Sequence, residues 1–266
     1  MEKLKLVLPA QKILSANCRI SKKLMGSIEN QIEKEFLAMP LRPQTMGFYS
    51  VRTAILASVK NETKSFYGRV LDVGCGFMPY RKLIESNSQV EKYIGMDLEK
   101  PTFYGHIEPD LKWNGEKIPL ENQSVDCVMA TEFLEHYAEP EKILKEILRV
   151  LKPGGRFFAT VPFVWNLHEI PYDEYRYTPY SLERHLVNAG YKNIEIKALG
   201  GWNRAFAQMI GLWLTFSKMN RLTRIILRYS LFPFYVLLVK TDKKTTGFDG
   251  YENSMFSGLS VTATGK

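Results

Sequence analysis

Short apolar runs separated by amphipathic segments fill the middle of the chain. Buried strands are predicted over residues 69–73, 93–97, 126–131 and 156–162. A fifth strand is predicted over residues 192–199, where apolar and polar residues alternate as in a sheet with one exposed face. Because helical segments stand between the strands, the pattern predicts an α/β fold with a mostly parallel, doubly wound sheet.

Three helical segments have recognisable boundaries. The first is an amphipathic stretch over residues 48–59, before the first strand. In the third, before the strand at 192–199, we expect Ser181 as the N-cap and Gly190 as the C-cap. The second begins at Pro140, ends at a KPGG sequence, and places five apolar residues on one face: Ile143, Leu144, Ile147, Leu148 and Leu151.

The 266-residue chain carries a net charge of +8, which is unevenly distributed. Residues 1–68 contain eleven Lys and Arg against five Asp and Glu, and residues 200–244 contain eight against one. Residues 69–199 are acidic, with sixteen basic and twenty acidic side chains. The basic surplus therefore belongs to the two segments that flank the predicted sheet.

Cysteine usage and the N-terminus indicate where the protein resides. Cys18, Cys75 and Cys127 are widely spaced and form neither a CxxC pair nor an even framework. This usage is typical of a reducing compartment and predicts no metal site. The apolar run at the N-terminus stops at Gln11, which is too short for the core of a signal peptide. We therefore expect a cytoplasmic protein without an export signal.

The stretch VLDVGCGFMPY, residues 70–80, is the first chemical signature. A buried strand runs through Asp72, and Gly74 and Gly76 allow the backbone to approach a ligand closely before a helix begins. The third glycine of a dinucleotide-binding fingerprint is absent, so this pattern alone is weak evidence. Asp97 ends the next strand twenty-one residues after Gly76, where a carboxylate can accept both hydroxyls of a ribose.

Five linked motifs resemble those of class I S-adenosylmethionine-dependent methyltransferases in order and spacing. They are LDVGCG, YIGMD, IPLENQSVD, EFLEH and VLKPGGRFFATVP. The similarity covers about residues 69–200 and is closest to a large bacterial group that resembles quinone-biosynthesis methyltransferases. It implies a Rossmann-like sheet of seven strands with helices on both faces and one antiparallel strand, for which residues 257–266 are suitable.

The resemblance divides the chain into four parts. We expect a helical N-terminal extension over residues 1–68 and a cofactor-binding core over residues 69–201. An apolar and basic helical insertion follows over residues 202–250, and the final strand of the core sheet lies within residues 251–266.

The resemblance also implies that S-adenosylmethionine is the cofactor. Gly74 and Gly76 would pass beneath its amino-acid part, with Asp72 holding the loop or the ammonium group. Asn114 stands where the family usually has an Asp that accepts from the adenine amino group, and an amide oxygen can also accept that bond. The full implied set is Asp72, Gly74, Cys75, Gly76, Asp97, Leu98, Asn114, Gly115, Thr131 and Glu132.

Four further positions of this set have distinct expectations. Asp97 would bind the ribose, and Thr131 and Glu132 would line the methionine end. Cys75 is interpreted as a small filler in the loop and not as a nucleophile, because nothing beside it in the sequence lowers its pKa.

Two histidines are candidates for the base that methyl transfer to a hydroxyl requires. His136 ends the EFLEH motif, and His168 lies in the segment after the strand at 156–162. Ligands of open parallel sheets bind outside the carboxyl ends of the strands, which is where both would lie. For His136 a purely structural role in closing the turn remains an equal alternative.

The segment HEIPYDEYRYT, residues 168–178, is predicted to bind the acceptor. Its rings suit stacking on sugars or apolar rings, its carboxylates accept from hydroxyls, and its arginine pairs with carboxylate or phosphate. The residues expected to do this are Tyr172, Asp173, Tyr175, Arg176 and Tyr177. The alternative is a self-contained loop in which Arg176 pairs with Asp173 and the Tyr rings pack against the protein.

A narrower resemblance concerns the acceptor. GCGFMPYR, TVPFVWNLHEIPYDEYRYTPYSLERHL and the apolar C-terminal insertion are similar to a subgroup often found with bacterial surface-polysaccharide biosynthesis. This implies O-methylation of a glycan or lipid-linked saccharide. Two alternatives stay open: C-methylation of a quinone-like or other small apolar ring, and a non-catalytic S-adenosylmethionine-binding or membrane-scaffold protein.

The segment 204–240 is more apolar than a surface insertion should be. Its apolar runs, 205–216 and 225–239, are shorter than the about 20 residues that span a bilayer. Apolar faces beside basic residues favour helices lying on an anionic membrane surface, at the inner face of the cytoplasmic membrane. A lid over the core or a homodimer interface is the alternative. Nucleic acid is not expected, because exposed stacking aromatics do not accompany the charge.

Overall fold

The computed structural model describes residues 26, 28–99, 108–243, 245 and 247–265. The prediction that no export signal is present concerns the first residues of the chain, which lie outside the described part. Two short helical turns, η1 (Glu33–Leu37) and η2 (Pro43–Thr45), precede the first long helix.

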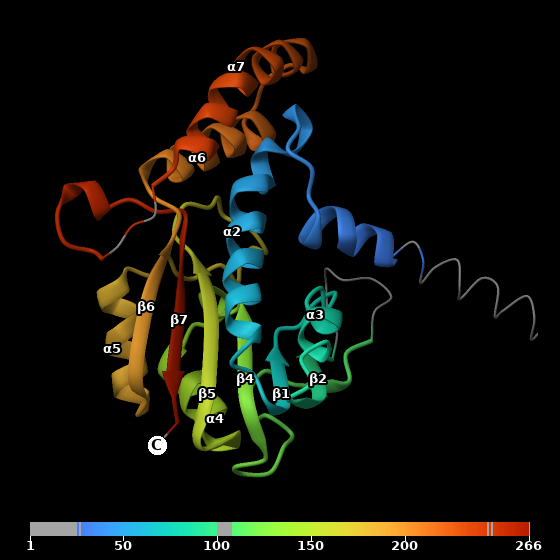
Figure 1. The fold of residues 1–266 in the computed structure, drawn as a ribbon, viewed down its shortest axis with the longest axis vertical. Helices are drawn as coiled ribbons and strands as arrows, with labels where there is room; N and C mark the ends of the chain where they lie inside the picture. The colour runs from blue at the N-terminus through green and yellow to red at the C-terminus, as the bar shows by residue number, and fades with distance from the viewer. Residues whose placement is uncertain (1–25, 27, 100–107, 244, 246, 266) are drawn as a thin grey trace, which may run out of the picture.

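The described residues form one seven-stranded sheet in the order β3-β2-β1-β4-β5-β7-β6 (Figure 1). The strands from β3 to β5 run parallel, and β7 is antiparallel to both of its neighbours, β5 and β6. The predicted α/β fold and its antiparallel seventh strand are confirmed. The strands are β1 (Gly68–Val73), β2 (Val90–Leu98), β3 (Leu111–Trp113), β4 (Val125–Thr131), β5 (Leu151–Pro162), β6 (Lys192–Leu199) and β7 (Gly258–Thr264).

Helices cover both faces of the sheet. On one face, α2 (Met46–Thr63) and α3 (Arg81–Glu85) pack through buried residues such as Ile55 and Ile84. On the other, α4 (Pro140–Val150) and α5 (Pro179–Ala189) pack through residues such as Ile147 and Leu186. The 3₁₀ turn η3 (Leu134–His136) connects β4 to α4. The amphipathic stretch predicted over residues 48–59 is therefore part of α2, and it faces the sheet as its apolar spacing requires.

Two predicted helix boundaries are wrong by a few residues. Helix α4 ends at Val150, and Leu151 already pairs with Val125 as the first residue of β5. The KPGG sequence lies inside this strand as an irregularity, because the register shifts before Arg156 pairs with Cys127. The glycines therefore bend a strand instead of separating a helix from one.

The N-cap of α5 is Thr178 and not Ser181. Ser181 lies in the first turn, where its backbone N–H donates to Thr178 Oγ1 at 3.2 Å and its Oγ accepts from the Thr178 N–H at 3.0 Å. Pro179 occupies the first helical position, which needs no N–H donor. Gly190 ends the helix with φ 105°, as predicted.

The segment between β6 and β7 folds into α6 (Trp202–Phe216), α7 (Arg221–Thr241) and the short η4 (Tyr251–Asn253). Figure 1 places α6 and α7 together at one end of the molecule, the end that lies opposite the C-terminus. Helix α6 packs closely on α2 through Gly47 and Gly211, since a Cβ on Gly211 would lie 2.0 Å from the Met46 carbonyl oxygen. The insertion is thus anchored to the core by helix contact.

Helix α7 is longer than its apolar run suggested. It is a single helix of 21 residues that continues through Arg228 and Pro233, with mean hydropathy 1.5 in its most apolar window. Only 11% of that window is buried, and among the described residues α7 alone is long and apolar enough to cross a bilayer. By length and composition alone α7 could cross a bilayer, which differs from the expectation that its apolar run is too short.

Candidate active site

The site lies where the strand order reverses, at the carboxyl ends of β1 and β4. The loop Gly74-Cys75-Gly76 follows β1, and Thr131 and Glu132 end or follow β4. His168 arrives in the long loop after β5. In an open parallel sheet this reversal opens a crevice between loops that leave in opposite directions, which is where ligands bind.

The glycine loop after β1 is tightly fixed. Gly74 has φ 69°, and a Cβ there would lie 2.6 Å from the Phe133 ring, so the position admits only glycine. The N–H groups of Gly74 and Cys75 both donate to the Met96 carbonyl oxygen, at 2.9 and 3.1 Å. The Gly76 N–H donates to Asp97 Oδ2 at 2.8 Å. The carboxylate predicted to bind a ribose therefore also holds the loop.

A second group of predicted residues lies at the ends of β2 and β3. Asp97 Oδ1 accepts from the Leu98 N–H at 2.8 Å, and the Leu98 side chain is 45% exposed. A Cβ on Gly115 would lie 3.5 Å from Leu98 Cδ2, so these two positions are neighbours. Asn114 Oδ1 accepts from the Glu116 N–H at 3.0 Å, which leaves one lone pair of this oxygen for another donor.

Asp72 lies buried beneath the loop. Its Oδ2 accepts a hydrogen bond from the Tyr93 hydroxyl, and its Oδ1 has no hydrogen-bond partner among the described residues. Burial raises the pKa of Asp72 to about 7. A buried carboxylate with an unsatisfied oxygen favours a cationic group nearby.

A cavity of about 140 Å³ adjoins the loop. The residues that line it come from η1, α2, the loops after β1 and β4, and the loop after β5. They are Phe36, Val51, Arg52, Ile55, Gly74, Cys75, Gly76, Phe77, Pro79, Tyr80, Thr131, Glu132, His136, Trp165, His168 and Glu169. A larger cavity of about 540 Å³ lies between α2 and β6, but none of the loops that follow β1, β4 and β5 reaches it.

Glu132 is the acidic side chain at the sheet edge of this cavity. It takes φ 50°, and its Oε1 accepts from the Thr160 hydroxyl at 2.9 Å. Burial raises the pKa of Glu132 to about 6, although the hydrogen bond from Thr160 favours the ionised form.

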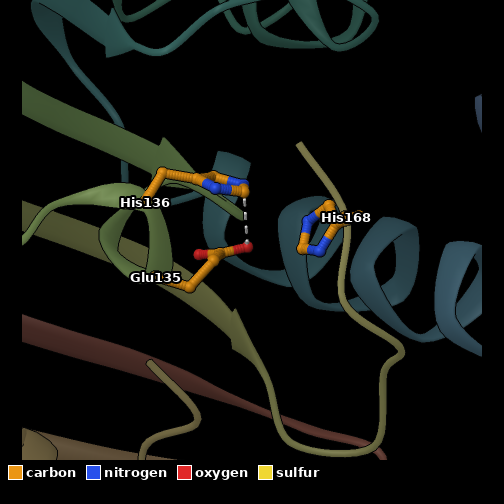
Figure 2. A group of neighbouring side chains, drawn as sticks. All are labelled: Glu135, His136 and His168. Carbon is orange, nitrogen blue, oxygen red and sulfur yellow. Dashed lines mark ion pairs between the residues drawn. The ribbon is translucent and has the colours of Figure 1, made fainter. Parts of the chain in front are cut away.

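The two histidines predicted to be catalytic meet at this cavity (Figure 2). Their ring centroids are 4.7 Å apart, with the rings edge to face. His136 Nδ1 lies 3.3 Å from the Tyr172 carbonyl oxygen, and His168 Nδ1 lies 3.1 Å from Asp173 Oδ2. Burial lowers the pKa of His136, which favours the neutral imidazole that a general base requires.

With this geometry established, comparison with known proteins identifies the core. Residues 71–159 match the family model described as "Methyltransferase domain". The core is a methyltransferase domain. Methyltransferases that use S-adenosylmethionine are among the solved structures that share its fold. The match covers the segment from β1 to β5, which contains the glycine loop, Asp97 and His136.

Curated relatives of this methyltransferase domain differ in chemistry. A ubiquinone biosynthesis O-methyltransferase of Idiomarina loihiensis is 30% identical over 126 residues, which cover 42% of this chain and 51% of that protein. A ubiquinone/menaquinone biosynthesis C-methyltransferase of Bartonella henselae is 28% identical over 191 residues, covering 56% of this chain and 72% of that protein. The chain spans about half or less of the first curated relatives it matches.

Solved structures share the fold. An S-adenosylmethionine-dependent methyltransferase from Archaeoglobus fulgidus superposes with TM-score 0.51 and 15% identity, covering 80% of this chain and 92% of that one. A geranyl diphosphate methyltransferase in complex with S-adenosylmethionine gives TM-score 0.51 and 12% identity, covering 82% and 86%. These likenesses establish the Rossmann-like methyltransferase architecture.

The loops of the methyltransferase domain fit the cofactor. A Cβ on Gly74 would collide with Phe133, so glycine keeps the loop close to the core, and the unpartnered Oδ1 of Asp72 suits a nearby ammonium group. Asp97 and the exposed Leu98 are the last two residues of β2, at the edge where a ribose and an adenine would bind. Burial raises the pKa of Cys75 far above its usual range, so this thiol is a filler of the loop and not a nucleophile.

The acceptor loop departs from its prediction, because none of the five predicted substrate residues lines the cavity. The Asp173 side chain is 2% exposed and receives both Arg176 terminal nitrogens, at 2.7 and 2.8 Å. Tyr175 donates to the Ala138 carbonyl oxygen at 2.9 Å. These contacts agree better with the alternative, a self-contained loop, than with an acceptor-binding loop.

The prediction that Tyr177 binds the substrate is wrong. Its ring lies in the core with 2% exposure, and its hydroxyl donates to the Leu134 carbonyl oxygen at 3.0 Å, so it has no surface to offer a substrate. Tyr172 is 63% exposed and remains accessible outside the cavity. The loop instead contributes Trp165, His168 and Glu169 to the cavity lining.

Two charged residues near the site were missed in the sequence. Glu135 is fully buried between Glu132 and His136, and its place in the EFLEH motif was the available signal. Arg52 lines the cavity from α2, with its guanidinium 4.2 Å above the centre of the Phe36 ring. No local pattern could have placed Arg52, since helix α2 reaches the site only through tertiary packing.

Proposed function

We propose that the chain is an S-adenosylmethionine-dependent O-methyltransferase of a glycan or lipid-linked saccharide, working at the inner face of the cytoplasmic membrane. The observation that carries the proposal is the His136 and His168 pair at a cavity beside the cofactor loop. A hydroxyl acceptor needs its proton removed as the methyl is transferred, and a neutral imidazole suits that role at physiological pH.

The cofactor supplies a methyl group already activated on a sulfonium. The protein's residues align the acceptor and exclude water. Phe36, from η1, and Arg52, from α2, close the cavity over the loops of the sheet. Asp173, which is held by Arg176, orients the His168 ring through Nδ1, so that Nε2 is available to accept the acceptor's proton.

A chain of aromatic rings supports access from a membrane. Trp165 lines the cavity, and its ring centroid lies 5.8 Å from that of Phe48 on α2. Phe48 in turn lies 5.9 Å from Phe216 at the end of α6, which is 50% exposed. An acceptor with an apolar carrier is thus proposed to approach the cavity along apolar surface.

The exposed apolar side chains of α6 and α7 support binding to lipid. Contiguous exposed apolar surface of this kind marks an interaction site, and basic residues beside it select an anionic partner. The apolar side chains are Trp202, Phe206, Met209, Trp213, Phe216, Leu222, Ile225, Ile226, Tyr229, Phe234 and Leu237. The accompanying basic residues are Lys218, Arg221, Arg224, Arg228 and Lys240.

Methylation of a quinone-like ring is the second candidate. Two curated relatives are named as O- and C-methyltransferases of quinone biosynthesis. Aromatic residues make up part of the cavity lining and suit an apolar ring. They are Phe36, Phe77, Tyr80 and Trp165.

The experiment is methyl transfer from labelled S-adenosylmethionine to fractionated acceptors. We expect label in lipid-linked saccharides, with loss of transfer in the His136→Ala, His168→Ala double variant. His185→Ala is the matched control, because His185 pairs with Glu141 on the helical face and lies outside the cavity. Label in quinone precursors alone would establish the second candidate. Cofactor binding without transfer to any fraction would favour the non-catalytic binding protein.

A further inference from the structure

Glu135, His136 and His168 form a cluster that the sequence did not predict (Figure 2). Each offers one nitrogen or oxygen atom, and the three atoms lie within 4.8 Å of one another. Glu135 and His136 come from η3 after β4, and His168 comes from the loop after β5. The parallel pairing of β4 with β5 brings the two loops to the same edge of the sheet.

The Glu135 carboxylate is the observation that points to a ligand. Its side chain is completely buried, and neither oxygen has a hydrogen-bond partner among the described residues. Buried carboxylates are otherwise paired with a cation or coordinate a metal. Base catalysis by the histidines makes no use of this group.

The histidines present their ring nitrogens in the manner of metal ligands. Each Nδ1 faces an oxygen acceptor: the Tyr172 carbonyl for His136, at 3.3 Å, and Asp173 Oδ2 for His168, at 3.1 Å. A proton on Nδ1 satisfies both contacts and leaves the lone pair on Nε2. Metal-binding histidines are held in this way by carboxylate or carbonyl oxygens. His136 Nε2 lies 3.8 Å from Glu135 Oε1.

We propose that Glu135, His136 and His168 bind one first-row divalent cation, of which Zn²⁺ is the representative. Two imidazoles and a carboxylate suit such ions, and three protein ligands leave a position open for a substrate oxygen. Two ligands of a tetrahedral ion, each about 2.1 Å from it, are about 3.4 Å apart, whereas the three atoms here lie within 4.8 Å of one another. The side chains therefore draw inward when the ion binds.

The proposed cation site adds a step to the proposed function and depends on that function. The open position takes the acceptor hydroxyl and lowers its pKa, so that the oxygen loses its proton to water at the cavity before methyl transfer. His136 and His168 then act as ligands instead of as the base. The surrounding charge favours a cation, because Glu132 lies beside Glu135 and Glu169 Oε2 lies 3.8 Å from His136 Nε2.

Metal binding by the untagged full chain tests the proposal. The protein is stripped with a chelator and titrated with Zn²⁺, and separately with Co²⁺, whose visible absorption reports nitrogen and oxygen coordination. We expect one ion per chain, and a loss of affinity of about tenfold or more in His136→Ala, in His168→Ala and in Glu135→Gln. Glu135→Gln keeps the side-chain shape while removing the charge. His185→Ala, which changes a histidine outside the cluster, keeps the wild-type affinity.

The outcomes separate this inference from the proposed function. Binding far below one ion per chain, or binding that both histidine substitutions leave unchanged, would overturn the metal site. S-adenosylmethionine affinity is measured in the same samples by calorimetry. If the cofactor binds and zinc does not, only the metal inference fails. If zinc binds and the cofactor does not, the proposed function fails. Circular dichroism of each variant identifies a loss of binding that reflects unfolding.

Discussion

His136 and His168 lie with their ring centroids 4.7 Å apart, although they belong to loops that follow different strands. Their Nδ1 atoms turn away toward the Tyr172 carbonyl oxygen and Asp173. Each ring therefore keeps Nε2 for a proton or a ligand, and both residues line the same cavity. Whether they share a proton or a cation there, the pair defines where the acceptor oxygen is expected to sit.

Asp97 is predicted to be the strongest single determinant of cofactor affinity. Its two oxygens hold the Gly76 and Leu98 N–H groups, both at 2.8 Å, and the same carboxylate is expected to receive the ribose hydroxyls. Hydrogen bonds to a charged group contribute about 1.5–3 kcal/mol, so Asp97→Ala should weaken S-adenosylmethionine binding by about tenfold or more. Isothermal titration measures this.

The control for Asp97 lies on the same strand. Glu91, at the amino end of β2, is exposed, and Glu91→Ala should leave cofactor affinity unchanged. Equal affinities for wild type and Asp97→Ala would contradict the assignment of this edge to the ribose.

Cofactor binding should depend on pH through Asp72. Burial raises its pKa to about 7, so the side chain is mostly protonated at pH 6 and mostly ionised at pH 8. The ionised form attracts the cofactor's positive charges, and affinity should rise by about tenfold between these pH values. Calorimetric titration at several pH values checks the slope. Asp72→Asn should bind more weakly and without this slope; an unchanged slope in that variant would assign it to another group.

Asp173 should be a major contributor to folding stability. Burial alone would raise the pKa of its carboxyl, but hydrogen bonds from Arg176 and the His168 N–H outweigh burial and hold the pKa at about 2. Removing one partner of a buried ion pair costs about 3–5 kcal/mol, so Asp173→Asn should lower the free energy of unfolding by about 3 kcal/mol. Urea denaturation measures the difference.

The sign of the acid dependence follows from the lowered pKa. The ionised Asp173 stabilises the folded state fully above its ordinary value of 3.8, and this contribution is lost as pH falls toward about 2. Asp173→Asn should lack this part of the acid transition. Lys197→Gln, which breaks an exposed pair with Glu195, should change neither quantity measurably.

Helix α7 should bind anionic vesicles. Ile226 is 55% exposed, and Ile226→Asp places a charge on the apolar surface without disturbing the core. We expect the wild type to sediment with anionic liposomes, less so at 1 M salt, where the screening length falls to about 3 Å. The variant should bind about tenfold more weakly.

The matched control is Val187→Asp on α5, where a 57% exposed valine lies on the other side of the sheet. It should bind liposomes as the wild type does. Equal binding of both variants, or indifference to lipid and salt, would argue against a membrane surface there. Association that resists alkaline extraction would indicate that α7 spans the bilayer.

Local sequence determined five of the seven strands, the start of α4 at Pro140 and the end of α5 at Gly190. Alternation of apolar and polar residues defines β6, short mainly apolar runs define β1 and β4, and Gly190 ends α5, because each depends on neighbours within a few residues. The cofactor loop could also be predicted from the sequence. Its glycines and Asp97 stand at a fixed spacing, because the loop after β1 and the end of β2 must meet.

Only the tertiary structure decided what surrounds the acceptor. Arg52 and Phe36 reach the cavity by packing of α2 and η1 against the sheet, and no local pattern encodes that distance. The same holds for the loop after β5: residues 168–178 offered nine polar or aromatic side chains, but burial assigned Tyr177 to the core and Asp173 to Arg176. Composition lists the groups that are available, and packing decides which of them remain free to meet a ligand.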